Sequence, residues 1–381
     1  MTSSSSQAAD TPRFIDNGML ELLTVIGTGA YGVVYLALDT RYGEPVYRAV
    51  KRMQRKGLDA RQRHFQRREI LLHSLASAHP SVVALDRVIE ADDCVYVVME
   101  YGEEGDLFSM ITEAKRYAGN DELVRRVFLQ LIDGVAWLHA LGISHRDIKP
   151  ENVVCSNGGT RVRICDFGLA TSQVASGEFG CGSSFYVAPE CLGVWSPEEG
   201  TYPTRSGDVW SLGVILVNLV CGRNPWRMAA PSDESFNAYL TDPSFLRQIL
   251  PVSDECGAIL ERIFTLDPGQ RITLPALRKL VLSASSFFAG CSEAEVSPEV
   301  YYLEEFDTPS LQGESGPTGL SPSSSDGGSL PPTPGLPAEG ACLGLQPYAM
   351  PWDLYGKNVC ACQSPDVKEA CPEGECLPFW V

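Results

Sequence analysis

The segment His145-Arg146-Asp147-Ile148-Lys149-Pro150-Glu151-Asn152 carries the residue types that are needed to move a phosphoryl group. The carboxylate of Asp147 can accept or orient the proton of an attacking hydroxyl, and Lys149 can neutralise the phosphoryl group as it moves. Asn152 offers an amide oxygen to magnesium, and Asp166, which is followed by Phe and Gly, offers a hard carboxylate ligand. We predict that Asp147 and Lys149 are catalytic and that Asn152 and Asp166 are the metal ligands.

A glycine-rich stretch, Gly27-Thr28-Gly29-Ala30-Tyr31-Gly32-Val33-Val34, precedes this segment in the chain. Glycines let backbone amides approach phosphates closely because no Cβ stands in the way. The same pattern occurs in ordinary glycine-rich hairpins and in dinucleotide-binding folds, where a helix follows the glycines directly. Here Val33–Leu38 has the composition of a strand, which favours a hairpin that covers phosphates.

Lys51 and Glu69 are candidates for a pair near those phosphates. Lys51 ends the β-rich segment that begins at Tyr47, and after a glycine loop such a lysine can reach the α- and β-phosphates. It then needs an anionic partner, and Glu69, within a helix predicted over residues 60–77, is the best candidate. The alternatives are a solvated lysine and an exposed glutamate, since Glu is a common helix former.

Three regions of the chain are expected to position these residues. Residues 20–98 contain several strand-like segments and one predicted helix, in which Phe65, Leu72 and Leu75 have helical spacing. Residues 103–282 are mainly helical, with helices predicted over 121–141, 205–221, 253–265 and 274–281. From residue 284 onward the chain is rich in Pro, Gly and Ser, so it is not expected to bury enough apolar surface to order itself.

The charge of the chain is concentrated in this last region. The net charge is −18, of which residues 284–381 contribute −12 through 14 acidic and 2 basic side chains, leaving −6 for the rest. This balance argues against a nucleic-acid-binding surface. The 13 cysteines, without a secretory signal segment, indicate free thiols in a reducing compartment. Because no apolar run approaches the ~20 residues of a membrane span, we expect a cytoplasmic or nuclear protein without membrane or nucleic-acid partners.

In their order and spacing, these motifs resemble the eukaryotic protein kinase family, which also has counterparts of Ala188-Pro189-Glu190 and of Asp208. The resemblance implies an α+β fold with two lobes. Residues 19–102 would form a β-rich N-lobe with one helix, and residues 103–283 a mainly helical C-lobe. Residues 1–18 are expected to be a polar extension, and residues 284–381 an acidic, largely disordered tail whose regulatory partner the sequence does not identify.

The resemblance also implies ATP and Mg²⁺ as cofactors and proteins with Ser or Thr acceptors as substrates. Met99 corresponds to the gatekeeper of the family, Asp106 to the residue that binds the ATP ribose, and Ala49 and Val154 to the residues that enclose the adenine. The residues assigned to nucleotide binding in this way are Gly27, Thr28, Gly29, Gly32, Val34, Ala49, Lys51, Glu69, Met99, Glu100, Tyr101, Asp106 and Val154.

Finer features resemble particular branches of the family. Lys149, followed by Pro-Glu-Asn, and Ser183 match the serine/threonine type rather than the tyrosine type. Residues 180–186 and 206–219 are similar to a fungal group of kinases that repress meiosis or respond to nutrient supply. The family pattern further implies that Asp208 anchors the catalytic loop and that Arg271 pairs with Glu190, although Arg271 taken alone could equally be a surface arginine.

The activation segment, which runs from Asp166 to Glu190, departs from the family at Phe179. Kinases that are switched on by phosphorylation carry a Thr or Ser at this position, and the arginine equivalent to Arg146 holds the phosphate. We predict that Arg146 pairs with Glu178 instead and that Phe179 packs against Phe65. The alternative is a mobile segment that is controlled by a partner or by phosphorylation of Thr171, Ser172 or Ser176.

Two other functions compete with that of a protein kinase. A pseudokinase scaffold would be favoured by loss of Lys51, Asp147, Asn152 or Asp166, and all four are present. A small-molecule kinase is disfavoured by Ser183 and by the Ala-Pro-Glu motif. In the tail, the cysteines match no zinc spacing, and the Ser-Pro and Thr-Pro pairs fit regulatory phosphorylation and chance equally well.

Overall fold

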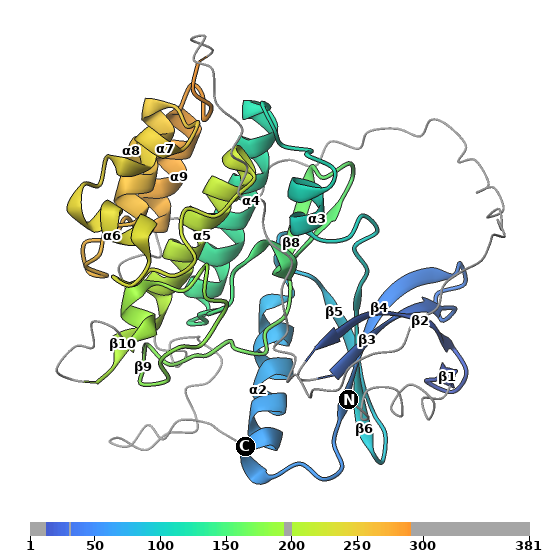
Figure 1. Cartoon of the computed structure of the whole chain (residues 1–381). Helices are drawn as coiled ribbons and strands as arrows, with labels where there is room; N and C mark the ends of the chain where they lie inside the picture. The colour runs from blue at the N-terminus through green and yellow to red at the C-terminus, as the bar shows by residue number, and fades with distance from the viewer. Residues whose placement is uncertain (1–12, 30–31, 194–199, 291–381) are drawn as a thin grey trace, which may run out of the picture. The chain divides into compact units, whose positions relative to one another are not determined.

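The computed structural model describes residues 13–29, 32–193 and 200–290 of the 381-residue chain. Within these residues an antiparallel sheet of six strands, in the order β1-β2-β3-β4-β6-β5, forms the N-terminal part of the fold (Figure 1). Buried and partly exposed side chains alternate along the second half of β3, as expected of a strand with one face on a core. The strands are β1 Phe14–Ile15, β2 Leu20–Gly29, β3 Gly32–Asp39, β4 Val46–Gln54, β5 Leu85–Glu90 and β6 Cys94–Glu100.

Helix α2 (Ala60–Ala76) follows β4 in the chain and lies beside this sheet (Figure 1). It begins with a capping box, in which the Asp59 side chain accepts from Gln62 N at 2.7 Å and the Gln62 side chain accepts from Asp59 N at 3.0 Å. Its buried residues, Glu69, Leu72, His73 and Ala76, have the spacing of a single helix face. The helix therefore presents a carboxylate and an imidazole to the interior.

Helices dominate the rest of the described chain. Helix α5 is its centre, since every residue from Asp208 to Val220 is buried. The α+β, two-lobed prediction is confirmed. The remaining elements are α3 Leu107–Thr112, α4 Asp121–Ala140, η1 Pro150–Asn152, β7 Val153–Ser156, β8 Arg161–Ile164, β9 Ala175–Ser176, η2 Pro189–Leu192, β10 Tyr202–Pro203, α5 Thr204–Cys221, α6 Glu234–Thr241, α7 Phe245–Ile249, α8 Asp254–Ile263 and α9 Leu274–Ser283.

Two short segments that flank the predicted kinase domain, residues 19–283, pack on it in the structure. At the N-terminal side, β1 pairs with β2 through Phe14 and Glu21, inside the expected extension. At the C-terminal side, Phe287 is fully buried, its N–H donates to Asp121 Oδ1 at 2.5 Å, and its carbonyl accepts from Ser253 N at 2.9 Å. Composition did not predict that residues 284–290 are ordered, because the serines before Phe287 resemble those of the tail. The buried ring of Phe287 nevertheless attaches this segment to the core.

Residues 1–12 and 291–381 lie outside the described residues, and with them the tail cysteines and the Ser-Pro and Thr-Pro pairs. Each helix of the described chain is too short or too polar to span a membrane.

Candidate active site

The glycine-rich stretch forms a hairpin of β2 and β3, in which Gly27 pairs with Val34, Thr28 with Val33 and Gly29 with Gly32. A strand follows the glycines, as the hairpin prediction requires. Gly32 has a φ of 154°, and a Cβ at this position would lie 2.3 Å from the carbonyl oxygen of Arg52. Only glycine fits so close to the backbone of β4. Residues 30–31, at the tip of the hairpin, lie outside the described residues.

Lys51 on β4 joins the two acidic residues predicted to surround it. Its Nζ lies 2.5 Å from Glu69 Oε1 and 3.1 Å from Asp166 Oδ1. Burial by itself would lower the pKa of Lys51, but the two carboxylates outweigh it and raise this pKa above its usual range. For Asp166 the effects are reversed: burial by itself would raise the pKa of this carboxylate, but the neighbouring Lys51 ammonium outweighs burial and lowers it. Lys51 is therefore charged and Asp166 ionised at neutral pH.

Aromatic packing holds Asp166 in this position. Its φ of 61° is sparsely populated by residues other than glycine. The next residue, Phe167, is buried and stacks on His73 of α2, with ring centroids 4.7 Å apart. His145 contacts the same ring edge-on at 5.2 Å. The three rings fix the strained turn that directs Asp166 toward Lys51.

Asp147 is the centre of a hydrogen-bond network. Its Oδ1 accepts from the backbone N–H and the hydroxyl of Ser183, both at 3.1 Å, and its Oδ2 accepts from Asn152 Nδ2 at 2.9 Å. Lys149 Nζ donates to Ser183 Oγ at 2.7 Å and lies 3.2 Å from Asp147 Oδ2. Because the amide nitrogen of Asn152 faces Asp147, its amide oxygen points away and can bind a cation.

The buried Asp208 of α5 anchors the loop that carries Asp147 by binding its backbone. Asp208 Oδ1 accepts from Arg146 N at 2.8 Å, and Oδ2 accepts from His145 N at 2.9 Å and lies 2.8 Å from His139 Nε2. Arg146 has a left-handed φ of 66°, which these bonds help to maintain. The predicted anchoring contact is confirmed.

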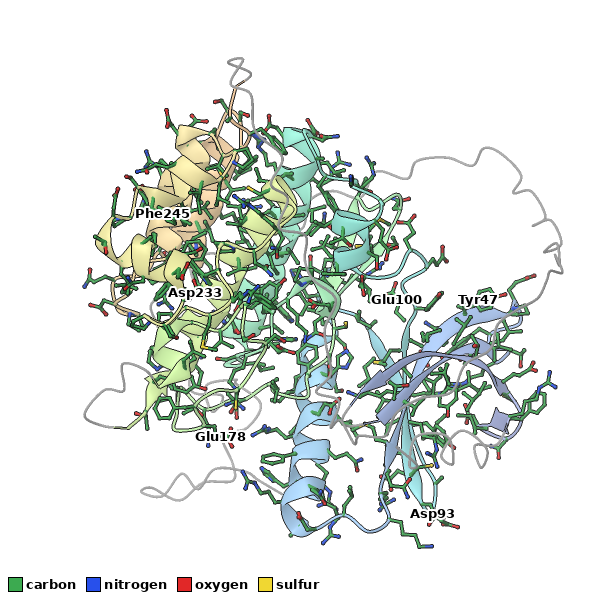
Figure 2. All side chains as sticks on the ribbon, in the orientation of Figure 1. Tyr47, Asp93, Glu100, Glu178, Asp233 and Phe245 are labelled. Carbon is green, nitrogen blue, oxygen red and sulfur yellow. The ribbon has the colours of Figure 1, made fainter. Side chains whose placement is uncertain are left out.

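The residues assigned to the adenine lie where the sheet joins the helical lobe. Ala49 and Met99 pair across β4 and β6. Glu100, Tyr101 and Gly102 make the connection, on which Figure 2 labels Glu100. A Cβ on Gly102 would lie 2.7 Å from Val154 Cβ, so the connection passes directly over Val154.

Asp106 follows this connection and bridges to Val154 of β7. Its Oδ1 accepts from Ser109 N at 2.8 Å and so caps α3. Sequence reasoning missed a further ion pair here, between Arg163 of β8 and Glu100, at 3.0 Å. No local pattern signals a pair of residues this far apart in the chain.

The activation segment contains the ion pair predicted for it. Arg146 Nη1 and Nη2 lie 3.0 and 3.1 Å from Glu178 Oε2, and Arg146 Nε donates to the carbonyl of Leu169 at 2.7 Å. Tyr202 donates its hydroxyl to the carbonyl of Glu178 at 2.9 Å. The labelled Glu178 can be located in Figure 2. The Arg146–Glu178 prediction is confirmed.

The prediction that Phe179 packs against Phe65 is wrong. The ring of Phe179 packs against Tyr202, with centroids 5.4 Å apart, because the pairing of β9 with β10 brings Tyr202 beside it. Phe65 instead lies under the guanidinium groups of Arg61 and Arg68, at 5.2 and 4.8 Å.

Glu190 at the end of the activation segment pairs with Arg271, as the family pattern implies. The two N–O distances are 2.6 and 3.0 Å, and both side chains are buried. The guanidinium also lies 4.9 Å from the ring centre of Trp210. The surface alternative for Arg271 is thereby excluded.

The stacked His73 predicts a pH dependence of stability. Burial lowers the pKa of His73 to about 4, assisted by Lys51 and His145 and opposed by the Val83 carbonyl and by Asp166. In the unfolded chain the imidazole titrates near 6.5, so as the pH falls the unfolded state takes up the proton first. The free energy of unfolding should therefore fall by about 3 kcal/mol between pH 6.5 and 4.

Urea unfolding as a function of pH measures this effect. His73→Leu should remove that part of the slope, whereas His64→Leu, on the exposed face of the same helix, should leave it unchanged. Equal slopes in the wild type and His73→Leu would contradict the assignment.

Comparison with known proteins agrees with this geometry. Residues 20–282 match the protein kinase domain. A negative regulator of sexual conjugation and meiosis from Schizosaccharomyces pombe is 45% identical over 280 residues, which are 69% of this chain and 59% of that protein. Two serine/threonine-protein kinases of Saccharomyces cerevisiae, VHS1 and SKS1, are 38% and 39% identical over 232 residues. The matches cover 58% of this chain and 50% and 46% of those proteins, so the chain spans only about half to three fifths of these relatives.

Proposed function

We propose, since the chain belongs to the protein kinase family, that it transfers the γ-phosphate of ATP to serine or threonine side chains of protein substrates. One observation carries most of this proposal: Ser183 and Asn152 hold the carboxylate of Asp147 from both sides, with Lys149 beside it. A positioned base next to a cation is what transfer to a hydroxyl requires.

In this mechanism Asp147 accepts or orients the proton of the substrate hydroxyl. Its Oδ1 is held by two donors from Ser183, so the carboxylate is already oriented before substrate binds. Oδ2 accepts one hydrogen bond, from Asn152, and would receive the substrate hydroxyl beside the Lys149 ammonium, which lies 3.2 Å away. Lys149, through its bond to Ser183, stays close to the phosphoryl group and offsets its negative charge.

The donor set fits Mg²⁺, which prefers carboxylate and amide oxygens. Asp166 would supply the carboxylate and Asn152 the amide oxygen, which its hydrogen bond to Asp147 directs away from that residue. When bound, Mg²⁺ neutralises charge on the phosphate oxygens. Lys51 would contact the α- and β-phosphates, and Glu69 keeps its ammonium in place.

The remaining nucleotide contacts are proposed from where the residues lie in the fold. The apolar side chains of Val34, Ala49 and Val154 suit the adenine ring, with Met99 behind it and the backbone of residues 100–102 at its polar edge. Asp106 uses Oδ1 to cap α3, which leaves Oδ2 for a ribose hydroxyl. The hairpin residues Gly27, Thr28, Gly29 and Gly32 would cover the phosphates.

The fungal relatives suggest the biological setting. One is named as a negative regulator of sexual conjugation and meiosis, which supports a role in meiotic signalling. The resemblance of residues 180–186 and 206–219 to fungal kinases that repress meiosis or respond to nutrients extends the proposal to nutrient signalling. We propose the cytoplasm or the nucleus as the place of action. The substrate protein and the partner of the tail follow from neither the site nor these names.

Transfer of labelled phosphate from Mg-ATP to a basic acceptor protein tests the proposal against a pseudokinase scaffold. We expect phosphoserine or phosphothreonine with the wild type and loss of transfer with Asp147→Asn. Nucleotide binding without any transfer by the wild type would favour the pseudokinase.

A substrate preference follows from Glu151, which lies beside Asp106 and Asp147. Its Oε2 is buried and has no hydrogen-bond partner among the described residues. Burial raises the pKa of Glu151, opposed by Lys149, so an additional cation would stabilise the carboxylate. A substrate arginine three residues before the acceptor would provide that cation.

A peptide library should show a moderate preference for Arg at position −3 and little preference at −2. The position that would attract an arginine at −2 is Asn218, which is uncharged, buried and already bonded to Tyr186 and Asn224. Glu151→Gln should reduce the −3 preference, and Glu113→Gln, an exposed change on the same lobe, should not. A proline-directed or acidic preference would refute this prediction.

The ion pair of Arg146 with Glu178 predicts activity without phosphorylation of the activation segment. The permanent carboxylate of Glu178 already pairs with the guanidinium of Arg146. In kinases regulated by phosphorylation, the phosphate of the activation segment makes this ion pair. Thr171 and Ser176 are buried, and Ser176 Oγ accepts from Glu178 N at 3.1 Å, so neither hydroxyl is accessible in this state.

Protein made in bacteria and treated with phosphatase should therefore keep its activity. Glu178→Ala should reduce that activity about tenfold, whereas Thr171, Ser172 and Ser176 changed together to Ala should not. A dephosphorylated enzyme without activity would show that the segment is an ordinary phosphorylation switch.

A further inference from the structure

Two thiols of the activation region border one small cavity. Cys181 is partly exposed and Cys191 is buried, and both are free. The cavity has a volume of about 20 Å³, and its wall also includes Arg146 and Gly207. A space of this volume holds about one water molecule, and the two cysteines border it from two different segments of the chain.

A backbone hydrogen bond joins the segment that carries Cys181 to Cys191. Gly180 N donates to the carbonyl of Cys191 at 2.8 Å, and the ring of Phe179 lies 3.2 Å from where a Cβ of Gly193 would be. Cys181 is therefore one residue away from the backbone group that Cys191 binds, and a disulfide between the two requires Cα atoms ~4.4–6.8 Å apart.

The sulfur of Cys191 points toward the cavity. A Cβ on Gly207, which borders the cavity, would lie 3.1 Å from Cys191 Sγ. Arg146 lines the same space, and its guanidinium is already paired with Glu178. Exposure of one cysteine and burial of the other suggest an order of reaction, with Cys181 meeting the oxidant first.

We propose that Cys181 and Cys191 form a modification site, an intrachain disulfide made by a peroxide. The Cys181 thiolate attacks one peroxide oxygen, so that an S–O bond forms, the O–O bond breaks and the departing hydroxide takes up a proton to become water. The Cys191 thiol then attacks the sulfenic sulfur, so that the S–S bond forms, the S–O bond breaks and a second water leaves. The two thiols lose two electrons and two protons, and the peroxide is reduced to two waters.

The bridge lies next to the contacts that orient Asp147. Gly182 follows Cys181 with a φ of 105°, and a Cβ there would lie 2.7 Å from the carbonyl oxygen of Arg146. Ser183, the next residue, binds Asp147. Drawing Cys181 toward Cys191 displaces this tightly fitted stretch, so phosphate transfer should fall about tenfold, since a shift of ~1 Å can cost on the order of 10²-fold. This consequence rests on the proposed function, whereas formation of the disulfide does not.

Peptide mapping of the full chain after hydrogen peroxide treatment tests the site. A protease that cleaves after Glu separates residues 179–190, with Cys181, from residues 191–198, with Cys191. The two peptides should be recovered as a disulfide-linked pair that dithiothreitol separates. A tryptic peptide would also contain Cys165 and would not distinguish the partners.

Variants separate the steps. Cys191→Ser should give no linked pair and should leave Cys181 as a sulfenic acid that dimedone labels. Cys221→Ser, which changes another partly exposed thiol, should keep the link. Oxidation should inactivate the wild type about tenfold, reversibly with dithiothreitol, and should spare Cys191→Ser.

No linked pair in the wild type, or a bond from either cysteine to Cys165, would overturn the site. A linked pair with unchanged transfer would support the site and overturn its effect on catalysis. A linked pair in a chain that transfers no phosphate even when reduced would overturn the proposed function and leave the disulfide standing.

Discussion

Replacing Asp166 by Asn should lower the turnover of phosphate transfer by about 10³-fold or more. The substitution keeps the shape of the side chain but removes the carboxylate that lies 3.1 Å from Lys51 and that is proposed to bind magnesium. Glu69 remains 2.5 Å from Lys51, so the ammonium stays paired and the fold should persist. Turnover and the KM for ATP are measured with labelled ATP, and circular dichroism verifies the fold.

The same chemical change at a surface position provides the control. Asp93 lies exposed on the turn between β5 and β6, 3.4 Å from Lys56, which is also exposed, and is labelled in Figure 2. Asp93→Asn should change turnover by less than about twofold, because exposed pairs contribute little. Lys51→Met should lower transfer as severely as Asp166→Asn. Normal turnover in a folded Asp166→Asn protein would refute the proposed mechanism.

Replacing Arg271 by Met should lower the free energy of unfolding by about 3–5 kcal/mol. Arg271 and Glu190 are 6% and 5% exposed, and their closest N–O distance is 2.6 Å. Removing the guanidinium strands a carboxylate in a site that water does not reach, and this penalty exceeds the Coulomb energy of the pair itself. Urea denaturation gives the difference.

An exposed ion pair on α4 shows what burial adds. Arg126 lies 3.6 Å from Glu122, with side chains 55% and 84% exposed, so Arg126→Met should cost less than about 1 kcal/mol. Changing Glu190 to Gln together with Arg271→Met should recover part of the loss, because no unpaired charge then remains. Equal costs for Arg271→Met and Arg126→Met would show that the buried pair does not stabilise the fold.

The sequence by itself determined the parts of the site that lie within short stretches of chain. The strand that follows the glycines predicted a hairpin, and spacing alone placed Lys149 and Asn152 near Asp147. Near neighbours on a strand or turn have few possible separations, so residue type and order were sufficient there. The same reasoning proposed Glu69 as the partner of Lys51, and the family resemblance added a pair that is farther apart in the chain, Arg271 with Glu190.

Only the tertiary structure decided contacts that depend on how elements dock. It gave Phe179 the partner Tyr202 instead of Phe65, paired Arg163 with Glu100, and bound residues 284–290 to the helical lobe through Phe287. It also brought Cys181 and Cys191 to one cavity. Periodicity identifies which face of an element is buried but not what covers it, because a shift of one residue in docking changes every side-chain neighbour while the pattern stays the same.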